Sequence, residues 1–306
     1  MSAPTIPAAG PHGGDGARLA QALGVNADEI LDLSVSLNPF APDVAPLIAE
    51  HAEAVRRYPD PEAATVALAT RVGVEPARLV LTNGGAEAIA LVAAEHPVGR
   101  VDRPDFSLYA RHLARLDPAG PRWRSNPHNP SGRLAAPTER ADVWDEAFYP
   151  LATGQWTRSD PDTIVVGSLT KLFACPGLRL GYVLAPDLDL AEALRRRQPR
   201  WSVGSLACTV LPDLLAGVDL PRWAEALAAS RAALVSVLRA GGAEPERSDA
   251  SYVLVPAAPG LRTHLARGHV LVRDTASFGI PDGVRIAVPN PAGLEQLRRA
   301  LEGWNP

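Results

Sequence analysis

Apolar residues follow two patterns along this chain, a helical spacing in some segments and short runs typical of strands in others. Helical spacing predicts helices over residues 17–23, 43–57, 59–71, 86–94, 221–240 and 260–267 and from residue 292 onward. Short runs predict strands over residues 78–82, 100–102, 122–124, 143–145, 163–168, 180–185, 251–255, 270–273 and 284–288. Strands that alternate with helices or glycine turns are typical of an α/β protein with a mostly parallel sheet.

The pattern changes after residue 207, where a long helical segment precedes several short strands. We therefore expect an N-terminal arm over residues 1–40, a large α/β domain over residues 41–207 and a smaller α+β domain over residues 208–306. Residues 1–16 are expected to be flexible, because they are rich in alanine, glycine and proline. A chain of 306 residues is long enough to bury a substantial core.

Composition argues against several classes of protein. A net charge of -4 disfavours nucleic acid as a partner. No apolar run approaches the roughly 18 residues needed to cross a bilayer, and the first residues lack a charged-then-apolar signal pattern. Two cysteines are too few for a disulfide framework, and the seven histidines show no HExxH spacing. We expect a cytoplasmic protein without a membrane partner or a metal site.

Lys171 is the single lysine of the chain, against twenty-nine arginines. Arginine does not lose its proton near neutral pH, whereas a primary amine can do so and form a Schiff base with a carbonyl. One interpretation is that Lys171 survives codon-driven drift on a solvated face. The glycine-containing stretch over residues 176–182 favours the other interpretation, a covalent cofactor anchor.

Gly84 and Gly85 follow a predicted strand and begin a predicted helix. Backbone N–H groups at such a helix start bind phosphate, with help from the helix dipole. Taken alone, the glycine pair indicates a tight turn, and no Gly-Lys-Ser follows that would make it a nucleotide-binding loop. Other predicted strands end in polar residues, among them Asp145 and Ser168, and the carboxyl ends of parallel strands share one edge of a sheet.

Seven motifs occur in order at residues 58–59, 83–86, 126–132, 145–148, 168–171, 179–182 and 284–288. Together they resemble the fold type I aminotransferase family, and most closely its branch of histidinol-phosphate aminotransferases and threonine-phosphate decarboxylases. The resemblance implies an α/β fold, with a mostly parallel sheet in the large domain and a smaller α+β domain. It also implies pyridoxal 5'-phosphate as the cofactor, a small phosphorylated amino acid as the substrate, and a homodimer with shared active sites.

The resemblance implies a role for individual residues. Lys171 would carry the covalent link, and Asp145 would pair with the pyridine nitrogen and keep the ring an electron sink. The other implied cofactor contacts are Gly84, Gly85, Ala86, Ser168 and Arg179 at the phosphate, Asn129 at the ring oxygen, Phe106 stacked on the ring, and Tyr58 at the phosphate of the partner subunit's cofactor. The implied substrate contacts are Arg285 at the carboxylate, Arg273 as a second anion contact or a surface salt bridge, and His12 and Asn38.

Phe148 favours decarboxylation over transamination. Aminotransferases of this branch usually have a tyrosine there, whose hydroxyl donates to the ring oxygen, a bond worth about 0.5–1.5 kcal/mol. Phe148 and the stretches 12–14, 30–39 and 201–203 resemble the threonine-phosphate decarboxylases of cobalamin synthesis, which convert L-threonine O-3-phosphate to aminopropanol phosphate. The alternative is an aminotransferase that acts on a phosphorylated amino acid such as histidinol phosphate.

Residues 110–125 and 133–144 are shorter than the family pattern. Parallel strands need a crossover of about a dozen residues or more, so we expect this part of the large domain to be trimmed or rebuilt, with weaker cofactor binding. Gly204 also stands where the decarboxylases commonly carry asparagine. A competing hypothesis is therefore a compacted relative that binds pyridoxal phosphate or a partner but turns over poorly. The retention of Lys171, Asp145, Asn129 and Arg179 speaks against it.

Overall fold

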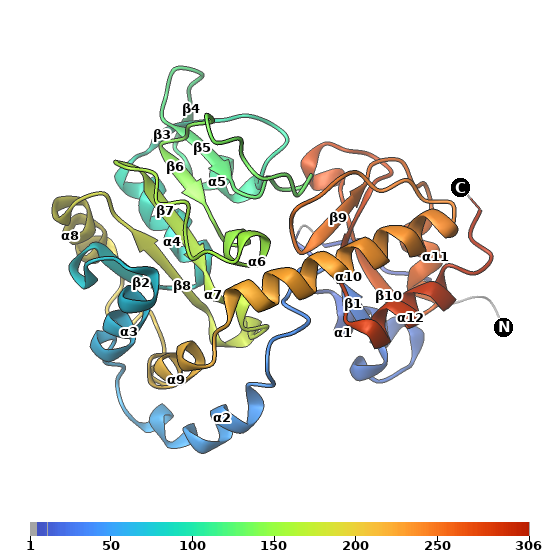
Figure 1. Ribbon diagram of the computed structural model, residues 1–306, viewed down its shortest axis with the longest axis horizontal. Helices are drawn as coiled ribbons and strands as arrows, with labels where there is room; N and C mark the ends of the chain where they lie inside the picture. The colour runs from blue at the N-terminus through green and yellow to red at the C-terminus, as the bar shows by residue number, and fades with distance from the viewer. Residues whose placement is uncertain (1–4, 11, 306) are drawn as a thin grey trace.

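The computed structural model describes residues 5–10 and 12–305, which form two β-sheets with helices around them (Figure 1). The larger sheet has the strand order β2-β8-β7-β6-β5-β3-β4. Its strands are β2 (Leu79–Asn83), β3 (Val98–Val101), β4 (Arg115–Leu116), β5 (Arg122–Ser125), β6 (Val143–Asp145), β7 (Ile164–Ser168) and β8 (Leu180–Leu184). Among these strands only β8 runs antiparallel to its neighbours, so the predicted mostly parallel sheet is confirmed.

Helices cover both faces of the larger sheet. Side chains alternate between the two faces along each strand, so each face presents apolar side chains to the helices. Val80 and Val166 pack into the core on one face, and Leu81 and Val165 into the core on the other. The helices of the first face are α4 (Gly84–Glu95), α5 (Ser107–His112) and α8 (Leu188–Arg197), and those of the second include α3 (Glu62–Val72) and α9 (Ser205–Ala216). Strands buried on both faces have nearly continuous apolar sequences, which is why β2 and β7 could be predicted.

The smaller sheet has the strand order β1-β10-β11-β9. Its elements are β1 (Leu31–Leu33), β9 (Tyr252–Val255), β10 (Val270–Asp274) and β11 (Val284–Ala287), with α1 (Gly16–Leu23), α11 (Leu261–Arg267) and α12 (Pro291–Ala300) packed around them. β1 pairs in parallel with β10, so part of the predicted arm completes this sheet. The division of the chain at residues 40 and 207 stays a prediction.

The N-terminal segment is tied to the small sheet by hydrogen bonds. Gly14 N donates to Ser34 Oγ at 2.8 Å, and Arg262 Nη1 donates to the carbonyl of Pro7 at 3.0 Å. These contacts differ from the flexibility expected of residues 1–16, of which residues 1–4 and 11 lie outside the described residues. The N-terminal segment is therefore held against the small sheet.

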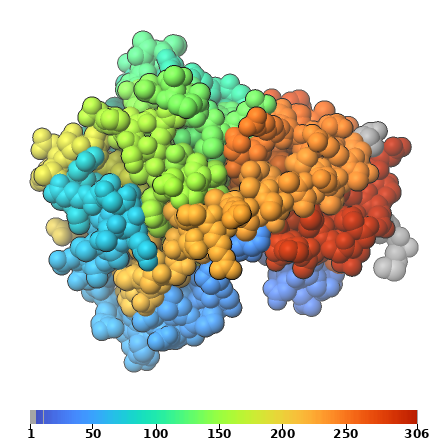
Figure 2. Space-filling view, viewed as in Figure 1, coloured from blue at the N-terminus to red at the C-terminus, as the bar shows by residue number. Residues whose placement is uncertain are grey.

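Helix α10 (Leu220–Ala240) joins the two lobes, and Figure 2 shows it lying across from one to the other. The predicted helix over residues 43–57 is instead divided into α2 (Ala45–Glu50) and a 3-10 turn η2 (Ala52–Arg56). The remaining short elements are α6 (Tyr149–Thr153), α7 (Leu169–Leu172), η1 (Ala27–Glu29), η3 (Pro76–Arg78), η4 (Pro176–Leu178) and η5 (Ala276–Phe278). Within the described residues, no helix has both the length and the apolar character needed to cross a membrane.

Residues 126–142, which connect the parallel strands β5 and β6, contain no helix. The guanidinium groups of Arg124 and Arg158 instead lie over the fully buried ring of Trp144, at 5.7 and 4.9 Å from its centroid. Arg158 also donates to three backbone carbonyls of the connection, and Arg124 pairs with Glu139. Stacked arginines therefore cover Trp144 in this shortened connection.

Candidate active site

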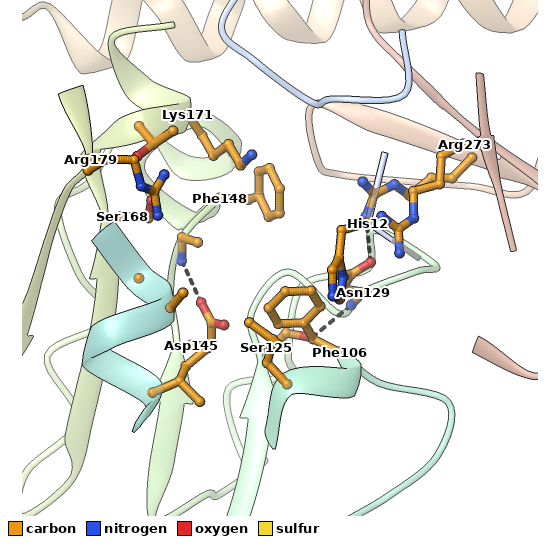
Figure 3. Close-up of a pocket in the computed structure, with 17 residues that line it drawn as sticks. His12, Phe106, Ser125, Asn129, Asp145, Phe148, Ser168, Lys171, Arg179 and Arg273 are labelled. Carbon is orange, nitrogen blue, oxygen red and sulfur yellow. Dashed lines mark hydrogen bonds between the residues drawn. The ribbon is translucent and has the colours of Figure 1, made fainter. Parts of the chain in front are cut away.

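A cavity of about 300 Å³ lies at the carboxyl ends of β5, β6 and β7, where the two sheets face each other (Figure 3). Most of the residues predicted from the sequence line it, namely His12, Gly85, Ala86, Phe106, Asn129, Asp145, Ser168, Lys171, Arg179, Arg273 and Arg285. The other lining residues are Ile89, Leu108, Ser125, Ala147, Phe148 and Thr170. The mostly parallel sheet explains this convergence, because its strands end together at one edge.

Lys171 follows β7 on the short helix α7, and its side chain points into the cavity near Phe148 (Figure 3). Burial lowers the pKa of Lys171 to about 8, with a further lowering from the nearby charges of Arg285, Arg179 and Arg273. About a tenth of this amine is therefore unprotonated at pH 7, far more than for an ordinary lysine. An unprotonated amine is the form that attacks a carbonyl.

Glycine at position 84 is required by a close approach at the start of α4. Its φ is +76°, and a Cβ atom there would lie 2.4 Å from Arg179 Nη2. A Cβ at Gly85 would lie 3.4 Å from the Cβ of Ser168. Free N–H groups at the start of this helix, the Ser168 hydroxyl and the Arg179 guanidinium therefore surround one small space. This donor set suits a phosphate group.

Asp145 ends β6 and is held by two hydrogen bonds. Ala147 N donates to its Oδ1 at 3.0 Å, and the Tyr109 hydroxyl donates to its Oδ2 at 2.8 Å. Burial raises the pKa of Asp145 to about 6, against the lowering effect of the Tyr109 bond. Tyr109 was not predicted as a site residue, although its position three residues after Phe106, at the start of a helix, could have indicated that the two lie on one face.

Arg273 and Arg285 lie directly opposite each other on the antiparallel strands β10 and β11, and Figure 3 shows Arg273 across the cavity from Arg179. Both are buried, at 4% and 6% exposed. Arg285 Nη1 donates to Asn129 Oδ1 at 2.6 Å. Burial, followed by the charge of Arg285, lowers the pKa of Arg273 to about 10. His12 lies beside Arg273, and burial and that charge lower its pKa as well. Like charges held this close favour a negatively charged ligand.

Asn38 and Tyr58 do not reach the cavity. Asn38 Nδ2 donates to the carbonyl of Leu172, its Oδ1 accepts from Phe40 N, and its own N–H donates to the carbonyl of Lys171. Asn38 thus supports the segment that carries Lys171, and its contact with the substrate stays a prediction. Tyr58 is 78% exposed and its ring lies 4.5 Å from that of Trp201, so its role in a partner's site stays a prediction.

Residues 123–301 match the family described as aminotransferase class I and II. The chain belongs to this family. Class I and II aminotransferases depend on pyridoxal phosphate, and this chain is a pyridoxal-phosphate-dependent enzyme, as the sequence predicted.

Two relatives represent the branch suggested by the sequence. The chain is 30% identical over 245 residues to threonine-phosphate decarboxylase of Salmonella typhimurium, an alignment that covers 64% of this chain and 67% of the relative. It is 28% identical over 307 residues to histidinol-phosphate aminotransferase of Rhodospirillum centenum, with 82% and 84% covered. The suspected branch is therefore confirmed, but the relatives carry different activities.

Solved structures share the fold. Histidinol-phosphate aminotransferase from Sinorhizobium meliloti has a TM-score of 0.80 at 19% identity, covering 97% of this chain and 94% of that one. L-threonine-O-3-phosphate decarboxylase from Porphyromonas gingivalis has a TM-score of 0.74 at 21% identity, covering 89% and 98%. The predicted fold type I architecture is confirmed.

The lining of the cavity fits the family's cofactor. Lys171 supplies a buried primary amine, and Asp145 supplies a carboxylate whose orientation is set by two donors. Glycine at position 84 lets the Arg179 guanidinium lie against the start of α4, which places donors for a phosphate together. Phe106 and Phe148 add apolar walls. The donor set and the shape of the cavity therefore agree with pyridoxal phosphate.

Proposed function

We propose that this enzyme decarboxylates L-threonine O-3-phosphate to aminopropanol phosphate, a reaction of cobalamin biosynthesis. The observation that carries the proposal is the pair of buried arginines, Arg273 and Arg285, next to His12. L-Threonine O-3-phosphate has two anionic groups, a carboxylate and a phosphate, whereas histidinol phosphate has one. A cavity with two buried guanidinium groups on one wall suits the substrate with two anions.

The cofactor end of the cavity is formed by residues of the larger sheet and its helices. When bound, pyridoxal phosphate supplies a carbonyl for the substrate amine and a ring that withdraws the electron pair of the broken Cα bond. We assign the phosphate to the start of α4 at Gly84, Gly85 and Ala86, with Ser168 and Arg179. Asp145 would hold positive charge at the ring nitrogen, Phe106 would stack on the ring, and Asn129 would bond the ring oxygen.

Which bond of the substrate Cα breaks depends on how the protein orients the substrate. In our assignment Arg285 binds the substrate carboxylate, and Arg273 and His12 bind its phosphate. Arg285 would thereby set the orientation of the substrate bond between Cα and the carboxylate. Lys171, with its pKa of about 8, then delivers a proton from Nζ to the Cα that has lost carbon dioxide. Phe148, which lines the cavity without a hydroxyl, keeps that region apolar.

An aminotransferase is the second candidate, because histidinol-phosphate aminotransferases are among the relatives and Lys171 can equally remove the Cα proton. The discriminating experiment is a single-turnover reaction of the cofactor-loaded enzyme with L-threonine O-3-phosphate. Carbon dioxide and aminopropanol phosphate are expected. A keto acid without carbon dioxide would establish transamination. A protein that shows the visible absorbance of the lysine-bound cofactor but forms neither product would be the compacted, poorly active relative.

The proposal includes a homodimer in the cytoplasm. Its support is Tyr58 and Trp201, which are 78% and 60% exposed and form an aromatic pair on the surface. Large exposed aromatic side chains are typical of interface residues. Sedimentation of the parent protein is expected to give twice the chain mass. A second test mixes Tyr58→Ala subunits with Lys171→Ala subunits. If Tyr58 serves the partner's site, mixed dimers have one site that carries both substitutions and one that carries neither, so activity is partly restored.

A further inference from the structure

Asp105 is a buried aspartate, 7% exposed, that is not among the residues lining the cavity. Its Oδ1 accepts hydrogen bonds from Phe106 N at 2.7 Å and from Ser125 Oγ, and its Oδ2 accepts from Ser125 N at 3.1 Å. Three donors therefore converge on one carboxylate. This arrangement matches the ionised form, which can only accept.

Keeping a carboxylate at this place is costly. Burial raises the pKa of Asp105 to about 6, whereas the bonds from Ser125 and Phe106 and the charge of Arg124 lower it. The ion-pair partner of Arg124 is Glu139, at 2.6 Å, and not Asp105. The direct contacts of the Asp105 carboxylate are therefore its hydrogen bonds. A neutral side chain would be easier to bury. The charge is therefore expected to organise something that a neutral residue could not.

The three bonds reach two residues of the proposed cofactor site. One goes directly to the backbone of Phe106. The other passes through Ser125, whose Oγ donates its single proton to Asp105 and accepts a bond from Asn129 N at 2.8 Å. An N–H can only donate, so Ser125 must direct its own proton elsewhere, and Asp105 receives it. Asn129 Oδ1 in turn accepts from Arg285.

We propose that Asp105 is a positioning residue of the cofactor site. Its carboxylate holds Phe106 directly and Asn129 through Ser125, and so sets the two side chains that we assign to the face and the oxygen of the cofactor ring. This inference rests on the proposed function of those two residues. Asp105 touches neither cofactor nor substrate, and it acts through the backbone of the residues it holds.

A similar aspartate–serine arrangement elsewhere in the chain provides a matched control. Asp32 Oδ1 accepts from Ser34 N at 2.9 Å and from Ser34 Oγ, and Ser34 Oγ accepts from Gly14 N at 2.8 Å. This second relay holds the N-terminal segment that carries His12, on the substrate side of the cavity. Its loss should leave the cofactor ring in place.

The test compares Asp105→Asn, Ser125→Ala and Asp32→Asn with the parent protein. Asparagine keeps the shape of Asp105 but removes its charge and turns an amide N–H toward Ser125 N–H. Alanine at position 125 removes only the hydroxyl that reaches Asn129. The readouts are the Kd for pyridoxal phosphate without substrate, the visible circular dichroism per bound cofactor, and the thermal midpoint of the cofactor-free protein.

We expect Asp105→Asn and Ser125→Ala each to raise the Kd about tenfold or more, the scale of one bond to a charged group. The visible circular dichroism per bound cofactor should fall by about half, since it reports how the ring is held, while Asp32→Asn stays within about twofold in Kd. Parent Kd and dichroism in both site variants, with only a lower thermal midpoint, would overturn the proposal. An equal loss in Asp32→Asn would do the same.

The experiment also distinguishes a variant that fails to fold from a failure of the proposed substrate. If Asp105→Asn does not fold, Ser125→Ala alone decides, because it leaves the carboxylate and its bond to Phe106 N intact. If the parent binds the cofactor but releases no carbon dioxide from L-threonine O-3-phosphate, the substrate assignment fails. The binding and dichroism measurements then still decide the role of Asp105.

Discussion

Replacing Tyr109 with phenylalanine removes a single oxygen atom from a fully buried side chain. That hydroxyl donates to Asp145 Oδ2 at 2.8 Å, which leaves Ala147 N as the other donor to this carboxylate. The ring of Tyr109 packs between Phe106 and Trp123, so the apolar contacts of the ring are retained by phenylalanine. The substitution therefore removes the bond to Asp145 and leaves the packing of the ring in place.

The magnitude depends on the charge of Asp145. A hydrogen bond to a charged group contributes about 1.5–3 kcal/mol, and one between neutral groups about 0.5–1.5 kcal/mol. Because the pKa of Asp145 is raised to about 6, the folded protein binds this proton more tightly than the unfolded chain does. The contribution of Asp145 to the free energy of unfolding therefore falls as pH rises from about 4 to about 6. Loss of the Tyr109 bond raises the pKa of Asp145 further, which widens the pH range over which this contribution is lost.

The assay is urea unfolding of the cofactor-free protein at pH 8 and at pH 5. Tyr109→Phe is expected to lower the free energy of unfolding by about 1.5–3 kcal/mol at pH 8 and by clearly less at pH 5. Tyr252→Phe is the control, because this equally buried hydroxyl donates to the neutral carbonyl of His128 at 3.1 Å. Its loss should be the same at both pH values. An equal loss at both pH values for Tyr109→Phe would refute the reasoning.

Three further predictions follow from the same structure. The pKa of Lys171 is lowered to about 8, so the unfolded chain binds this proton more tightly than the folded protein does. The free energy of unfolding of the cofactor-free protein, measured by urea titration, should therefore rise as pH rises from about 8 to 10. Lys171→Met should abolish this rise. Arg158→Lys keeps the charge but loses the stacking on Trp144 and most of the bonds to carbonyls. It should lower the free energy of unfolding by about 2–4 kcal/mol. The control Arg298→Lys, at an exposed position, should lower it by at most about 0.5 kcal/mol. Arg273→Gln should raise the KM for L-threonine O-3-phosphate about tenfold or more and leave the Kd for pyridoxal phosphate unchanged, and a parent-like KM would exclude Arg273 from the substrate site.

Local features account for the elements that were predicted correctly. β2, β7 and β8 are apolar runs because both faces of their sheet are covered, and α10 shows a clear helical spacing over its 21 residues. The helices α5, α6, α7, α8 and α9 and the strands β1 and β4 were not predicted. β1 and β4 have three and two residues, too few to show any period.

By itself, the sequence determined the family, the single amine at Lys171 and the glycine start of α4, because each depends on residue identity within a short segment. Only the tertiary structure decided the contacts that orient these groups. The bond from Tyr109 to Asp145 joins residues 36 positions apart, and Asn38, expected at the substrate, lies 134 positions from its partner Leu172. Such bonds form where elements distant in sequence meet, and no periodicity along the chain encodes that meeting.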